Sequence, residues 1–235
     1  MPDARGGPRP LPVDAVLFDL DGTLADTAPD LGAALNRVRA DRGLDPLPLE
    51  RLRPYASHGA RGLLGAGLAI APGEPDYVAL RDAFLAHYAA ALCVASALFA
   101  DVDAVLAALD ARGVPWGIVT NKAARFTEPL LAALSLASRA RAVVCGDTTP
   151  FPKPHPAPLR HAAERLGVAV SRCVYVGDAR RDVEAGRAAG MPTLVARWGY
   201  IEPGEAPELW SADGILEAPP ALLEWLPLSR DTSPR

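Results

Sequence analysis

Short apolar stretches alternate along the chain with longer stretches in which apolar residues recur at helical spacing. The short stretches are apolar on both faces, which predicts buried strands of a parallel sheet. We expect these strands at residues 15–18, 116–120, 142–145, 173–176 and 193–196. Helices are expected at residues 101–112, 122–134, 156–166 and 180–189, three of them ending before a glycine. Helices between the strands predict a doubly wound α/β fold with a parallel sheet.

One interval lacks strand patterns. Between about residues 27 and 93 the spacing predicts helices at residues 30–42, 60–69 and 75–92, separated by glycines and prolines. We therefore expect an all-helical domain, residues 27–93, inserted into an α/β core formed by residues 13–26 and 94–226. The proline-rich and polar ends, residues 1–12 and 227–235, are expected to be flexible tails.

The composition excludes several classes of protein. Half of the 235 residues are hydrophobic and 22% are charged, as in a soluble globular protein. The net charge of −4 offers no broad basic surface, so we expect no nucleic-acid partner. No uncharged apolar run is long enough to span a bilayer, which excludes a membrane protein.

The N-terminal segment and the cysteines add two further expectations. No apolar signal region precedes Asp14, which favours a cytoplasmic location. Cys93, Cys145 and Cys173 lie far apart within apolar stretches, so we interpret them as buried hydrophobic residues rather than metal ligands.

Two carboxylates follow the first expected strand, in the sequence DLDGT. Asp19 and Asp21 lie where the strand turns toward the next element, at the sheet edge that binds ligands in open α/β folds. Aspartate and glycine also form ordinary turns. Two carboxylates at this spacing nevertheless crowd negative charge, which favours a shared cation or proton.

The other expected strands end in polar residues as well. Thr120 and Asn121 follow the second strand, Lys153 lies in the proline-rich FPKPHP after the third, and Asp178 and Asp182 follow the fourth. Each residue has an ordinary structural alternative, because threonine, asparagine and aspartate cap helices and lysines lie on surfaces. For Thr120 the functional alternative is to grip an anionic oxygen at a helix N-terminus. We expect four strand ends to meet at one sheet edge, and this convergence favours a common site that contains Asp19, Asp21, Thr120, Lys153, Asp178 and Asp182.

The residue types indicate the chemistry of this site. Clustered carboxylates without a local group of histidines or cysteines favour Mg²⁺ over zinc. A carboxylate nucleophile is repelled by a phosphate dianion, and Mg²⁺ together with Lys153 would remove that barrier. We therefore expect phosphoryl transfer through an aspartyl-phosphate intermediate.

Taken in order, DLDGT, the threonine of IVTN, the lysine of FPKP and GDARRD resemble the four motifs of the haloacid dehalogenase superfamily. The resemblance covers residues 14–200. It implies that Asp19 is the nucleophile and Asp21 the general acid and base. Asp19, the main-chain carbonyl of Asp21 and Asp178 would bind Mg²⁺.

The same resemblance implies roles for the remaining motif residues. Thr120 and Lys153 would hold the phosphoryl group, with Asn121 in support, and Asp182 would orient Lys153 or a metal-bound water. An acid at position 21 is typical of the phosphatases and phosphomutases of the superfamily and not of its dehalogenases.

The helical insert resembles the small cap of the phosphoglycolate phosphatase group, which closes over the substrate. The stretches SHGARGL, WGIVTNKAARFTEP and RWGYIEPGEAPELWSAD are similar to N-acetylmuramic acid 6-phosphate phosphatases. His58, Arg61 and Arg125 are candidate substrate contacts, with a structural histidine and solvated arginines as the alternatives.

These observations predict a cytoplasmic, Mg²⁺-dependent phosphomonoesterase, monomeric or homodimeric, that acts on a small phosphorylated metabolite. The substrate stays open between 2-phosphoglycolate and a sugar phosphate such as N-acetylmuramic acid 6-phosphate. A sugar phosphomutase is one alternative. A non-catalytic interaction module is another, against which stands the presence of Asp19, Asp21, Lys153 and Asp178.

Overall fold

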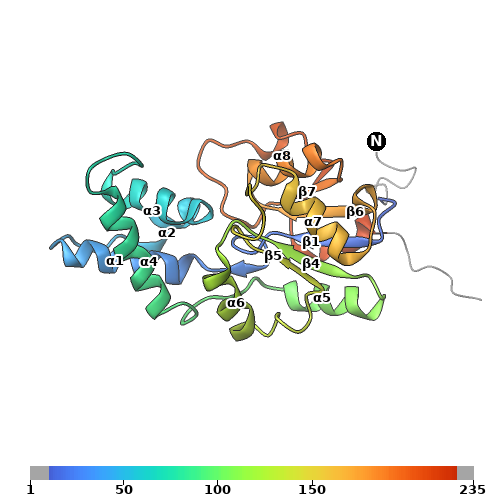
Figure 1. The fold of residues 1–235 in the computed structure, drawn as a ribbon, viewed down its shortest axis with the longest axis horizontal. Coiled ribbons are helices and arrows are strands. Elements are labelled where there is room, and N and C mark those ends of the chain that lie inside the picture. The colour runs from blue at the N-terminus through green and yellow to red at the C-terminus, as the bar shows by residue number, and fades with distance from the viewer. Residues whose placement is uncertain (1–10, 227–235) are drawn as a thin grey trace, which may run out of the picture.

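A six-stranded sheet forms the centre of the α/β core in the computed structural model, which describes residues 11–226 (Figure 1). All neighbouring strands are parallel, in the order β5-β4-β1-β6-β7-β8. The strands are β1 (Ala15–Phe18), β4 (Trp116–Val119), β5 (Ala142–Val144), β6 (Cys173–Gly177), β7 (Thr193–Ala196) and β8 (Gly214–Leu216). The chain builds outward from β1 in both directions, so the topological switch point, where such folds bind ligands, lies at the carboxyl end of β1.

Helices cover both faces of this sheet (Figure 1). Alternate residues of β1 point to opposite faces, so Val16 and Phe18 join one hydrophobic cluster and Ala15 and Leu17 join another. The first cluster includes α5 (Val102–Ala111), α6 (Ala124–Ala133) and α9 (Leu222–Trp225). The second includes α7 (Ala157–Leu166) and α8 (Arg180–Ala189). The predicted doubly wound α/β fold is confirmed.

The helical insert is also present, at the left of Figure 1. It contains α1 (Ala28–Asp41), α2 (Leu49–Leu52), α3 (Gly59–Leu68) and α4 (Tyr77–Ala90), and a 3₁₀ segment, η1 (Arg53–His58). These helices bury a hydrophobic cluster of their own, which includes Leu35, Leu63 and Phe84. At the base of the insert, β2 (Ala25–Asp26) pairs antiparallel with β3 (Ala97–Leu98). The domain boundaries expected above stay a prediction.

Several short elements differ from the sequence-based expectation. The strands β2, β3 and β8 and the helices α2 and α9 were not expected. Strands β2 and β3 span two residues each, helices α2 and α9 span about one turn, and β8 is only partly buried, so none has a clear apolar pattern. Helix α6 begins at Ala124 rather than at residue 122, because residues 121–123 form a turn after β4. Of the two expected tails, residues 1–10 and 227–235 lie outside the described residues. Leu11 is described, and its N–H donates to the Trp225 carbonyl (2.8 Å).

Within residues 11–226, no helix is both long enough and apolar enough to cross a membrane.

Asp30 fixes the place where the chain leaves the helical insert. This aspartate lies in the first turn of α1 and is 5% exposed. Its carboxylate accepts hydrogen bonds from the N–H groups of Val94, Ala95 and Ser96 and from the Ser96 hydroxyl, at 2.6 to 3.1 Å. The buried charge is thus compensated by donors of the segment between α4 and β3.

We expect Asp30→Ala to lower the free energy of unfolding by about 2 to 4 kcal/mol, because it leaves several buried donors without an acceptor. Chemical denaturation measures this change. Asp82→Ala is the matched control, since Asp82 pairs with Arg81 on the surface, and its effect should stay below about 0.5 kcal/mol. Equal effects of the two substitutions would show that Asp30 does not anchor this segment.

Candidate active site

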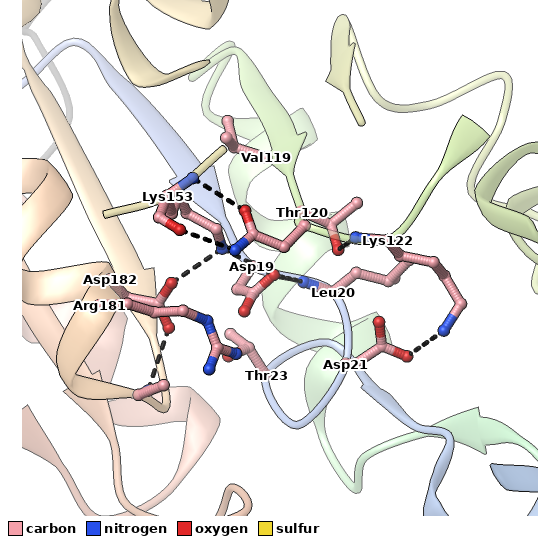
Figure 2. A network of polar contacts seen from close by, with 12 residues as sticks. Asp19, Leu20, Asp21, Thr23, Val119, Thr120, Lys122, Lys153, Arg181 and Asp182 are labelled. Carbon is pink, nitrogen blue, oxygen red and sulfur yellow. Dashed lines mark hydrogen bonds and ion pairs between the residues drawn. The ribbon is translucent and has the colours of Figure 1, made fainter. Parts of the chain in front are cut away.

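A buried lysine joins two carboxylates at the carboxyl edge of the sheet (Figure 2). The Lys153 Nζ atom lies 3.0 Å from Asp19 Oδ1 and 2.8 Å from Asp182 Oδ1, and it donates to the Tyr175 hydroxyl at 2.6 Å. The Lys153 side chain is 0% exposed. Asp19 follows β1 and Asp182 lies in the first turn of α8, so one cation compensates charges from two elements.

The loop that carries Lys153 is held by Asn121. The Asn121 side-chain amide donates to the Lys153 carbonyl, and its oxygen accepts the Lys153 N–H, both at 2.9 Å. The Tyr175 hydroxyl donates to the Val119 carbonyl at 2.7 Å, which fixes the third partner of the ammonium group. Burial raises the pKa of Tyr175 well above its usual value, so this phenol stays neutral. The main chain of Lys153 is therefore held by Asn121, and its ammonium group is held by a tyrosine that is itself fixed by the Val119 carbonyl.

Asp178 reaches the same edge from the end of β6. Its Oδ1 accepts the Thr23 hydroxyl at 3.1 Å and its Oδ2 accepts the Tyr200 N–H at 2.8 Å. The carboxylate lies directly against Gly22 and Gly199. A Cβ atom at Gly22 would lie 2.2 Å from Asp178 Oδ2, and one at Gly199 would lie 2.2 Å from the Asp178 Cβ. Gly22 also has a φ of +85°, so both its backbone conformation and the lack of space for a side chain require glycine at this position.

The cluster holds more negative than positive charge. Asp19, Asp178 and Asp182 each offer an oxygen atom within 4.8 Å of the others. Burial raises the pKa of Asp19 to about 6, although the Lys153 charge offsets part of this effect. Burial and the charges of Asp19 and Asp182 raise the pKa of Asp178 to about 7. Buried carboxylate oxygens with unbalanced charge fit a hard divalent cation.

Asp21 lies outside this cluster. Its Oδ1 forms an ion pair with Lys122 Nζ at 2.8 Å and accepts the Thr27 hydroxyl at 2.5 Å. The ammonium group of Lys122 also lies 4.9 Å from the centre of the Tyr88 ring, which belongs to α4. Burial lowers the pKa of Lys122, but the Asp21 charge and Tyr88 outweigh burial, so the net shift is upward and the lysine stays charged.

A cavity of about 660 Å³ opens between the sheet edge and the helical insert. Asp19, Asp21, Thr120 and Lys153 line it from the core. The Thr120 hydroxyl accepts the Lys122 N–H at 3.1 Å, so its own proton is available to a ligand. Because α6 begins only at Ala124, the expectation that Thr120 lies at a helix N-terminus is wrong. The amides beside it belong to the turn.

The three candidate substrate contacts line the same cavity. His58 comes from η1 and its Nε2 lies 2.5 Å from Glu202 Oε1. Arg61 comes from α3 and is exposed, and Arg125 comes from α6 with its guanidinium 4.6 Å from the centre of the Phe126 ring. All the predicted site residues except Asp178 and Asp182 therefore line this cavity, and these two belong to the buried cluster with Asp19.

Sequence reasoning missed Lys122, Arg181, Tyr200 and Glu202, which also line the cavity. One signal could have revealed Lys122. The chain contains 24 lysines and arginines, and of these only residues 122 and 153 are lysines. Both carry a compact ammonium group next to a motif aspartate, where a guanidinium fork would not replace it.

We expect Lys122→Met to lower kcat/KM about 10- to 100-fold, because Asp21 loses the cation that orients it and stabilises its charge. Lys122→Arg tests the geometry separately from the charge. A wild-type kcat/KM for Lys122→Met would contradict a role of Lys122 in orienting Asp21.

The raised pKa of Asp178 makes the stability of the metal-free protein depend on pH. A carboxyl group with a pKa of about 7 in the folded state and about 4 in the unfolded chain binds protons preferentially in the folded state between these values. This contribution is present at low pH and is lost as the pH rises through 7.

In EDTA, the unfolding free energy of Asp178→Asn should therefore increase relative to wild type between pH 5 and pH 8. Mg²⁺ should restore the wild-type protein at pH 8 and leave Asp178→Asn less affected. Thermal unfolding at each pH, with and without Mg²⁺, measures both effects. Parallel curves for the two proteins would mean that Asp178 carries no excess charge.

Comparisons with known proteins agree with this geometry. Residues 13–190 match the family model of the haloacid dehalogenase-like hydrolases. The chain is 42% identical over 212 residues to the N-acetylmuramic acid 6-phosphate phosphatase of Pseudomonas aeruginosa, covering 90% of this chain and 94% of the relative. It is 45% identical over 210 residues to the phosphoglycolate phosphatase of Xanthomonas campestris pv. campestris, covering 89% and 95%.

A solved structure shows the same fold. The crystal structure described as a predicted phosphoglycolate phosphatase from Haemophilus somnus has a TM-score of 0.79 and 26% sequence identity, with 91% of this chain and 97% of that chain covered. The hydrolase family and the phosphatase relatives confirm the expectation that this enzyme is a phosphatase, rather than a non-catalytic module. The chain belongs to the haloacid dehalogenase-like hydrolases.

Proposed function

We propose that this phosphatase hydrolyses a phosphate monoester of a carboxylated sugar, with Mg²⁺ as cofactor and Asp19 as nucleophile. The observation that carries the proposal is the pair of carboxylates with separate cations. Asp19 is held by Lys153 within the buried cluster, and Asp21 is held by Lys122 on the cavity wall. Two carboxylates in different environments suit two different roles.

In the first half of the reaction, a carboxylate oxygen of Asp19 attacks phosphorus and the bond to the ester oxygen breaks. Asp21 donates its proton to the departing oxygen. In the second half, Asp21 takes a proton from water, and the water oxygen attacks phosphorus. The bond between Asp19 and phosphorus then breaks, which frees Asp19 and inorganic phosphate.

The other residues of the site prepare this transfer. Lys153 compensates the charge of Asp19, and with Thr120 it offers donors to the phosphoryl oxygens. Asp182 pairs with Lys153 and so orients it. Asp19, the Asp21 carbonyl and Asp178 would hold Mg²⁺, which would supply further neutralisation of charge between nucleophile and phosphate when bound.

The size of the cavity favours the larger of the two candidate substrates. A volume of about 660 Å³ falls within the range of about 300–1,000 Å³ that is usual for ligands with a ring and several substituents. Phe84, Tyr88 and Phe126 give it an aromatic wall. A two-carbon ester such as 2-phosphoglycolate would leave most of this space to water. A sugar phosphate would fill it.

Arg61 and Arg125 are suited to bind a second anionic group of the substrate. Both line the cavity, and within residues 11–226 neither forms an ion pair with a carboxylate. N-acetylmuramic acid 6-phosphate, named for a relative of this chain, carries a carboxylate besides its phosphate. The phosphate would lie at Asp19 and the carboxylate toward these arginines.

Phosphate release with Mg²⁺ and with EDTA tests the proposal. We expect kcat/KM for N-acetylmuramic acid 6-phosphate to exceed that for 2-phosphoglycolate by about tenfold or more, and Asp19→Asn to abolish both. Arg61→Gln and Arg125→Gln should lower kcat/KM for N-acetylmuramic acid 6-phosphate but not for N-acetylglucosamine 6-phosphate, which lacks the carboxylate. A preference for 2-phosphoglycolate would reject the sugar substrate. Phosphate release in EDTA equal to that with Mg²⁺ would reject the metal.

The cytoplasmic location and the monomeric or homodimeric state stay predictions. Size-exclusion chromatography with light scattering measures the second.

A further inference from the structure

Arg181 connects the buried carboxylates to the helical insert. It lies in the first turn of α8, next to Asp182, and its guanidinium extends beside the cluster toward Thr23 (Figure 2). Burial lowers the pKa of Arg181, but the charges of Asp182, Asp19 and Asp178 raise it by more. The net shift is upward, so the group stays charged. It is therefore a second cation at the cluster, besides Lys153, and the proposed mechanism does not use it.

The outer end of the guanidinium binds the insert. The Nη2 atom of Arg181 donates to both the carbonyl and the hydroxyl of Ser57, at 2.9 and 2.8 Å. The Nη1 atom of Arg181 lies 3.5 Å from the Nδ1 atom of His58. Arginine can only donate, so this His58 nitrogen is the acceptor and Nε2 carries the proton that faces Glu202. Arg181, η1 and the loop after β7 thus meet in one polar chain.

The segment held by Arg181 packs closely against α3. A Cβ atom at Gly62 would lie 2.6 Å from both the His58 Cβ and the Tyr55 carbonyl, so η1 and α3 pack with no room between them. Ser57, His58 and Arg61 also line the cavity. A contact that fixes η1 therefore fixes the wall of the cavity that we assign to the substrate.

One further observation shows that the guanidinium is not fully used by the protein. The Nε atom of Arg181 is buried and has no hydrogen-bond partner among the described residues. Leaving this buried donor unpaired costs free energy. The attraction of the carboxylates and the two bonds to Ser57 offset that cost.

We propose that Arg181 is a positioning residue that holds η1 of the cap against the catalytic carboxylates and so sets the shape of the cavity over Asp19. The carboxylates of the core stabilise its positive charge, and Ser57 and His58 of the insert accept hydrogen bonds from its guanidinium. Loss of Arg181 frees η1, which weakens substrate positioning. The kinetic part of this inference rests on the proposed function, whereas the mobility of η1 does not.

Hydrogen exchange and kinetics of the full chain test this role. In Arg181→Gln, the amides of residues 53 and 55–58 should exchange at least about tenfold faster, while those of α1 keep their wild-type rates. The KM for the sugar phosphate should rise and kcat/KM should fall about tenfold or more. Arg187→Gln changes an exposed arginine in the last turn of the same helix, and it should alter neither the amide exchange nor the kinetic constants.

Two further variants separate geometry from charge. Arg181→Lys keeps the charge but loses the planar fork, so it should behave like Arg181→Gln, and rescue by lysine would overturn the proposal. Ser57→Ala removes one of the two acceptors of Nη2. In the Ser57→Ala background, Arg181→Gln should therefore change amide exchange and kcat/KM less than it does in the wild-type background. Additive effects would also overturn the proposal.

The outcomes also separate this inference from the proposed function. Unchanged amide exchange of η1 in Arg181→Gln overturns the positioning role, whatever the substrate. Faster exchange in Arg181→Gln, together with a wild-type enzyme that releases no phosphate from either ester, supports the contact and rejects the proposed substrate instead. If Arg181→Gln does not fold, amide exchange of η1 in Ser57→Ala replaces this test. We expect faster exchange in Ser57→Ala, and wild-type rates would contradict the proposal.

Discussion

The charge balance around Asp19 is the constraint on which the rest of the structure depends. Three buried carboxylates meet at one sheet edge, and such a group is unstable unless cations compensate it. Lys153 supplies one positive charge and is held by Asn121 and Tyr175. The pKa of Asp19 stays raised nevertheless, so the cluster still favours a further cation. The charge that Lys153 and Arg181 leave uncompensated supports the proposal that the site binds a divalent cation.

The same constraint explains how the cap and the core are joined. Lys122 and Arg181 each contact a motif aspartate or its cluster on the core side and a residue of the insert on the other. Tyr88 of α4 and Ser57 of η1 are their partners. The insert therefore contacts two cations that also neutralise carboxylates of the candidate site, so the shape of the cavity and the charge of the site depend on each other.

The sequence predicted the sheet well, because its buried strands leave local signals, whereas the roles assigned to the candidate site residues stay predictions. Strands β1 and β7 were located to the residue, since each is a fully buried apolar run between polar neighbours. Asp19 and Asp178 follow from strand ends. Arg181 could not be recognised, because its role comes from a contact across 124 positions of sequence. Lys122 is marked only by the scarcity of lysine, because its contact with Asp21 spans 101 positions. The short strand β8 has no periodicity to detect.

The central claim is that Asp19, within its charge-balanced cluster, becomes phosphorylated during turnover. Acid quenching of the enzyme during steady-state turnover with Mg²⁺, followed by peptide mass spectrometry, tests it most directly. The account predicts a phosphate on the peptide that contains Asp19, labile to hydroxylamine. A phosphate on another peptide, or none in repeated quenches during active turnover, would contradict it.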